Sequence, residues 1–83
     1  MAIQFAMVFP TDADAQAAVI TLRAARYEVD VQREDDGSCV LSAVGDVATS
    51  AIPATRLWMQ GIADKHGGDF LGHGGIAVHG AGA

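Results

Sequence analysis

The stretch Tyr27-Glu28-Val29-Asp30-Val31-Gln32 decides the fold, because its side chains alternate strictly between apolar and polar. The apolar side chains of this stretch point one way and the polar ones the other, as successive residues of a strand do. The pattern predicts a strand with one face in the core and the other in water, at the edge of a sheet.

The residues that follow predict a hairpin. Glu34-Asp35-Asp36-Gly37-Ser38 is rich in turn formers, and Asp-Gly tolerates the positive φ of a tight turn. Residues 39–44 then return as the second strand. On the other side, residues 2–9 are apolar on both faces, which predicts a central strand that Pro10 ends.

Two helices separate these strands from one another and from the chain's last segment. A hydroxyl cap at Thr11 and acidic residues after it begin the first helix, which we expect to run to about Arg26. Thr49 and Pro53 begin the second helix, and Gly67-Gly68 ends it. We expect residues 69–79 to form a fourth extended segment and residues 79–83 to fray.

The order strand, helix, strand, strand, helix, strand predicts an α+β fold. It is the ferredoxin-like βαββαβ arrangement, a four-stranded antiparallel sheet with two helices on one face. A chain of 83 residues has room for one core, so we expect one domain over residues 1–83. In the strand order 4-1-3-2, we expect this core to contain Phe5, Leu22, Tyr27, Val29, Leu41, Leu57, Trp58 and Ile62.

The sheet face away from the helices is expected to be apolar at its centre. Gln4, Ala6, Val8, Ser42 and Leu71 fall there, and a partner or a second copy of the chain should cover them. A homodimer through this open face is therefore one expectation, and a protein partner is the other.

The composition excludes several classes of function. Hydrophobic residues make up 51% of the chain, and ten acidic against five basic residues give a net charge of −5. Nucleic-acid binding needs a basic surface, so we expect neither direct nucleic-acid contact nor binding to an anionic membrane. We find no signal peptide and no apolar run of about 20 residues, and we expect a cytoplasmic protein.

No residue pattern predicts a metal or cofactor site. His73 and His79 lie six residues apart, roughly 20 Å along a regular strand, which is too far to share a metal. His66 is expected at the C-terminal end of the second helix. Cys39 has no neighbouring base and is interpreted as a small buried hydrophobe, and Trp58 as a core residue. We see no nucleophile with a base and an orienting group, so we expect no catalysis.

An acidic set is the candidate for binding a partner. It comprises Glu28, Asp30, Glu34, Asp35 and Asp36. Exposed charge on an edge strand commonly prevents aggregation between sheets, and that is one interpretation of this set. The other is a docking surface for a basic partner, at the opposite edge of the open face from His73 and His79.

The chain resembles the regulator of ribonuclease E activity B family. The resemblance begins with Phe9-Pro10 at the end of the first strand and Ala25-Arg26-Tyr27-Glu28-Val29 after the first helix. Its main part is Gly67-Gly68-Asp69-Phe70-Leu71-Gly72-His73. The family commonly carries a Gly, acid, Tyr, Asp, Gly, Trp run there, and in this chain Phe70, Leu71 and His73 replace the Tyr, Asp and Trp. The motif positions are Gly68, Asp69, Phe70, Gly72 and His73.

The resemblance implies a non-catalytic protein that binds and restrains a ribonuclease or another nucleic-acid enzyme. The acidic set adds the expectation that this partner has a basic segment. One alternative is a phage or mobile-element inhibitor of a nucleic-acid machine, of the anti-CRISPR type. Another is a dimeric regulatory domain that binds a small ligand. A ferredoxin-like dimeric monooxygenase is weaker, because no reactive polar group stands out.

Overall fold

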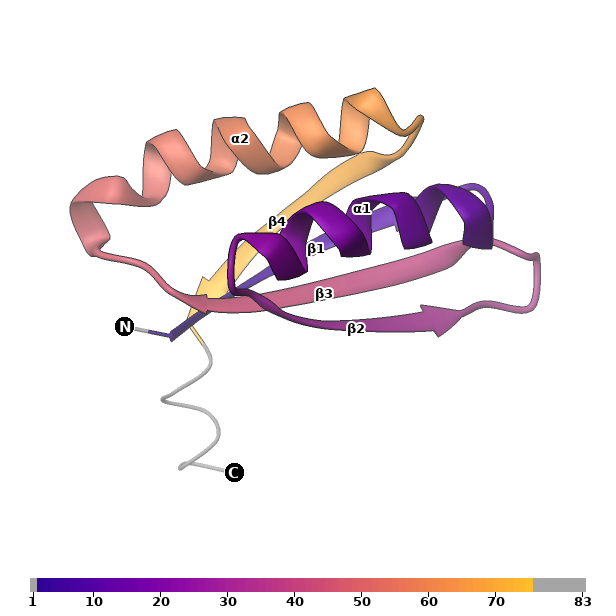
Figure 1. Cartoon of the computed structure of the whole chain (residues 1–83), viewed down its shortest axis with the longest axis horizontal. Helices are drawn as coiled ribbons and strands as arrows, with labels where there is room; N and C mark the ends of the chain where they lie inside the picture. Colours follow the sequence, from indigo (N-terminus) through magenta and orange to yellow (C-terminus); the bar gives the residue numbers. More distant parts are fainter. Residues whose placement is uncertain (1, 76–83) are drawn as a thin grey trace.

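The computed structural model describes residues 2–75 and shows the expected element order (Figure 1). The elements are β1 (Ala2–Phe9), α1 (Asp12–Ala24), β2 (Glu28–Arg33), β3 (Cys39–Asp46), a 3-10 turn (Thr49–Ala51), α2 (Ile52–Lys65) and β4 (Asp69–Gly75). The expectations for His79 and for a frayed tail at residues 79–83 lie outside the described residues.

The four strands form one antiparallel sheet in the order β2-β3-β1-β4. Both helices lie on the same face of the sheet, α1 over β1, β2 and β3, and α2 over β1 and β4 (Figure 1). The ferredoxin-like α+β prediction is confirmed. The alternating stretch at residues 27–32 corresponds to β2, which is an edge strand as predicted, and β1 is central as predicted.

The core lies between the helices and the sheet. The helix-facing side chains of β1 are Ile3, Phe5, Met7 and Phe9, all at most 2% exposed, and Leu22 of α1 is fully buried against this layer. Tyr27 and Val29 are half-buried and pack against it. These residues, with Leu41 and Ile62, confirm most of the predicted core.

The orientation of α2 differs from the prediction. Leu57 is 73% exposed and Trp58 is 41% exposed, so neither is a core residue. Met59, Ile62 and Ala63 face the sheet instead. Helical spacing fixes which residues share a face, but α2 carries two apolar faces, and the bulkier one is turned outward.

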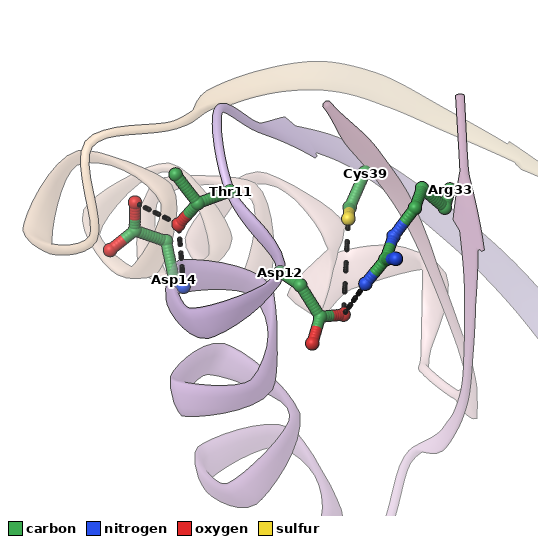
Figure 2. Close-up of polar contacts among 5 residues, drawn as sticks. All are labelled: Thr11, Asp12, Asp14, Arg33 and Cys39. Atoms are coloured by element: carbon green, nitrogen blue, oxygen red, sulfur yellow. Dashed lines mark hydrogen bonds and ion pairs between the residues drawn. The ribbon is translucent and has the colours of Figure 1, made fainter. Parts of the chain in front are cut away.

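Figure 2 shows how α1 begins. The Thr11 hydroxyl accepts a hydrogen bond from the Asp14 backbone N–H (3.2 Å) and donates one to Asp14 Oδ2 (2.9 Å), as the predicted cap requires. Asp12 joins α1 to the hairpin, because its Oδ1 lies 3.7 Å from an Arg33 guanidinium nitrogen and 4.0 Å from Cys39 Sγ. Cys39 itself is fully buried, as predicted.

The other helix ends are built differently. Arg26 has φ +71° and ends α1 with a left-handed residue, while the Tyr27 N–H donates to the Leu22 carbonyl. The predicted hydroxyl cap of the second helix at Thr49 is wrong. The chain passes through the 3-10 turn, and α2 begins at Ile52 after Ala51, which has no capping side chain.

A bulge in β4 changes which way its side chains point. Ala6 pairs with Gly72 and Met7 pairs with Phe70, so Leu71 is an extra residue. Gly72 has φ +126°, a conformation that a residue with a Cβ rarely adopts. Beyond the bulge, His73 pairs with Phe5 and therefore lies on the helix-facing side.

Candidate functional site

The face of the sheet opposite the helices has an apolar centre. Ala6, Val8, Val40 and Val44 lie there half-buried, and Leu71 projects beside them with 58% of its surface exposed. Gln4 and Ser42 from the neighbouring strands β1 and β3 join across this centre, the Gln4 side-chain amide donating to Ser42 Oγ at 2.8 Å. The open face predicted from the sequence is therefore present, with its polar pair mutually satisfied.

Acidic residues surround this apolar centre. Glu28 and Asp30 of β2 pair with Val44 and Ser42, so both point to the open face, and both are exposed. By the same alternation, two more acids point to the open face. Asp46 is at the end of β3, and Asp69, which pairs with Val8, is at the start of β4. Among residues 2–75, no Lys or Arg points to this face.

The basic residues are on the other side of the molecule. They lie on the helices, directly after α1, or on the helix-facing side of β2, and they are Arg23, Arg26, Arg33, Arg56 and Lys65. Three acids share that side: Asp12, Asp14 and Asp64. The remaining seven acids of the chain lie on the open face and in the β2–β3 turn. The charge of the molecule is therefore separated, with a slightly positive helix side and a strongly negative open face.

The β2–β3 turn adds its acids at one end of the sheet, as predicted. Glu34 and Asp35 are exposed there. Asp36 has a structural role as well, because its Oδ1 accepts hydrogen bonds from the Ser38 hydroxyl (2.6 Å) and the Ser38 backbone N–H (2.9 Å). These two bonds, the hydroxyl first, lower the pKa of the Asp36 carboxyl. We name Glu28, Asp30, Glu34 and Asp35 the acidic edge.

The expected position of His73 on the open face is wrong. His73 was placed opposite the acidic edge, but the bulge turns it to the helix-facing side, where its ring lies 6.0 Å from that of Phe5. Asp69 occupies the open side of β4 instead. The face is therefore acidic at both edges, with its apolar centre between them.

The motif positions of the last segment have structural roles. Gly68 leaves room for β1, because a Cβ there would lie 2.5 Å from both the Phe9 ring and the Val8 carbonyl oxygen. Phe70 packs near Phe5, with ring centroids 6.4 Å apart, and Arg56 lies 5.7 Å over its ring. With the bulge at Gly72, these contacts give three of the five motif positions, Gly68, Phe70 and Gly72, a structural role.

The sequence analysis missed the outer surface of α2. Leu57, Trp58 and Gly61 all face solvent there. A glycine inside a helix costs about 1 kcal/mol relative to alanine, and a Cβ at Gly61 would meet nothing within 4 Å. Leu57 and Trp58 were the available signal, and the sequence analysis interpreted both as core residues.

Metal and membrane sites receive no support from the part of the chain that the structure covers. No three His, Cys, Asp or Glu residues in that part come close enough to hold a metal ion. None of its helices has the length and apolar character needed to cross a membrane.

Comparison with known proteins identifies the chain's relatives. No curated protein and no solved structure gives a significant match. The sequence profile of the family described as regulator of ribonuclease activity B matches residues 1–74, nearly the whole chain. The family expected from the sequence resemblance is therefore confirmed. The chain belongs to the regulator of ribonuclease activity B family.

Proposed function

We propose that this protein regulates a ribonuclease of the ribonuclease E type by binding it directly, without catalysing a reaction itself. Its family membership supports the regulatory role. The observation that carries the binding mode is the separation of charge, which leaves the open face and its β2–β3 turn with seven acids and, among the described residues, no cation.

The partner segment we propose is rich in Lys or Arg and carries a few apolar side chains. The apolar centre of the open face (Ala6, Val8, Val40, Val44 and Leu71) would pack against its apolar side chains, and the acidic edge would pair with its cations. Complementary potentials steer such an encounter and fix its orientation, while the apolar contact supplies much of the affinity.

This arrangement also accounts for how a small acidic protein could restrain an RNA-cleaving enzyme. RNA is held largely through contacts of Lys and Arg with its phosphates. An acidic face seated on the same cations would compete with RNA for them. Since the face repels phosphate, we propose that the protein acts on the enzyme and not on the RNA.

Equilibrium binding and RNA cleavage test this proposal together. Purified ribonuclease E is titrated with the wild-type chain, and the initial rate of cleavage of a short RNA is recorded at each concentration. Glu28→Gln/Asp30→Asn removes two negative charges from the open face. The matched control, Gln16→Lys/Ala24→Lys, changes the net charge by the same two units at exposed positions of α1.

We expect the wild type and the control to bind and to slow cleavage alike, and the open-face variant to do both more weakly. Equal loss in the two variants would mean that only net charge matters. No binding of the wild type would overturn the proposal for this class of enzyme.

A further inference from the structure

The outer surface of α2 is a second apolar region, on the opposite side of the molecule from the open face. Its inner side already covers the sheet through Met59, Ile62 and Ala63. Its outer side presents Leu57, 73% exposed, and Trp58, 41% exposed. Monomeric proteins commonly expose single, scattered apolar side chains. Two large ones at adjacent positions of one helix form a patch instead.

The surface is hollowed on both sides of Leu57. A groove of 590 Å³ lies between α2 and β4, lined by Ile52, Pro53, Arg56, Leu57, Gln60 and His73. A smaller groove of 250 Å³ lies between the two helices, and Trp58, Gly61 and Lys65 are among the residues that line it. The ridge formed by Leu57 between two grooves suits an elongated apolar partner element.

Gly61 points to a helix as that element. No described residue occupies the space beside it, so packing among residues 2–75 does not require a glycine there. A residue without a side chain lets another backbone come close, which is how small residues act where two helices cross. Leu57 and Gly61 are one turn apart on the same face, so a projection and a notch lie next to each other.

The charges around this surface select an acidic partner. Arg56 is held over the Phe70 ring on the β4 side, and Lys65 lines the groove on the α1 side. Asp64 is the single acid of α2, against these two cations. A second copy of the chain would bring two more cations and one acid on its own α2, whereas a helix with Asp or Glu beside its apolar seam would complement Arg56 and Lys65.

We propose that the surface formed by Arg56, Leu57, Trp58, Gly61 and Lys65 binds an amphipathic helix of a protein partner, with acidic residues flanking its apolar seam. This site is independent of the open face and of the identity of the ribonuclease. It gives the protein two binding faces of opposite charge, so that it holds a basic segment on the sheet and an acidic helix on α2 at the same time.

Selection from a library of helical peptides tests this proposal. The immobilised wild-type chain is presented with 16-residue peptides randomised at charged and apolar positions, and the enriched peptides are synthesised for affinity measurements. We expect enrichment of Leu, Ile or Phe at spacings of three and four residues with Asp or Glu beside them, and binding in the micromolar range.

Substitutions at two exposed leucines, one on each face, show where the peptides bind. Leu57→Glu should weaken the selected peptides by about tenfold or more, whereas Leu71→Glu, an equivalent change on the open face, should leave affinity within about twofold. Gly61→Gln should act like Leu57→Glu by filling the notch. Because all three positions are exposed, circular dichroism should show each variant folded.

Three outcomes would overturn the proposal: no enrichment, enriched peptides without the acidic pattern, or affinities that Leu57→Glu does not change. Sedimentation equilibrium tests whether the occupant is a second copy of the chain. A wild-type dimer that Leu57→Glu dissociates would assign the surface to a second copy. Loss of ribonuclease binding in the open-face variant has no bearing on this result, so the two proposals fail separately.

Discussion

The ring of Tyr27 stacks on the ring of Trp58, with centroids 6.0 Å apart and planes inclined by 28°. Tyr27 precedes β2 and Trp58 lies on α2, so this pair connects the edge of the hairpin to the second helix. Tyr27 also meets Phe5 edge-on at 6.2 Å. Trp58 is therefore packed on one side although it is not part of the core.

Gly45 makes room for the tyrosine of this pair. A Cβ at Gly45 would lie 2.5 Å from two atoms of the Tyr27 ring. Gly45→Ala should therefore destabilise the protein by about 1–3 kcal/mol, as overpacking does. Gly74→Ala is the control, because a Cβ there meets nothing within 4 Å. Chemical denaturation of both variants decides the point, and equal midpoints would show that the Tyr27 ring moves aside freely.

Burial affects the titration of the Tyr27 phenol. Desolvation raises its pKa above the ordinary value of about 10. Between pH 10 and the folded-state pKa, the unfolded chain loses this proton while the folded chain keeps it. The free energy of unfolding should therefore fall as pH rises through this window. Tyr27 is the only tyrosine, so absorbance near 295 nm follows it directly, and a midpoint at or below 10 would contradict the burial.

Two leucines distinguish the core from the α2 surface. Leu22 is fully buried, and Leu22→Ala should cost about 2–5 kcal/mol, enough to unfold much of a domain this small. Leu57 is 73% exposed, and Leu57→Ala should change stability by no more than about 0.5 kcal/mol. Thermal melts of the two variants compare them. A larger loss from Leu57→Ala would restore the core role that its spacing first suggested.

Arg26 carries backbone strain that glycine would relieve. Its φ of +71° places a residue with a Cβ in the left-handed region at the end of α1. Arg26→Gly should raise the free energy of unfolding by up to about 1 kcal/mol, after the greater freedom of glycine in the unfolded chain is included. The reverse change at the end of α2, Gly67→Ala at φ +74°, should lower it by a similar amount. Urea denaturation that moves both midpoints the same way would reject this explanation.

Much of the fold could be predicted from local patterns. The alternation from Tyr27 to Gln32 gave an edge strand, and the two apolar faces of residues 2–9 gave a central one, because burial on one or both faces leaves a direct trace in a strand. The outer side of β2 followed from the same alternation, so the exposure of Glu28 and Asp30 was predicted correctly.

Two placements could not be predicted, each for a physical reason. The expected core grouped Leu57 and Trp58 with Ile62, but only Ile62 faces the sheet. The direction in which a helix faces is fixed by the preceding turn and by the sheet it packs on, and the local pattern shows neither. The position of His73 depended on one extra residue at Leu71, and a single-residue shift moves every later side chain of a strand to the other face.

The association rate with ribonuclease E tests the central claim, that the acidic open face docks on a basic segment, most directly. It is measured at low and at high salt for the wild type and for Glu28→Lys/Asp30→Lys, whose side chains already face water. We predict a fast wild-type rate that falls as salt shortens the Debye length from about 10 Å at 0.1 M, and a slow rate for the folded variant that salt changes little. Four equal association rates would contradict the claim and leave the acidic edge the role of keeping a small sheet from aggregating.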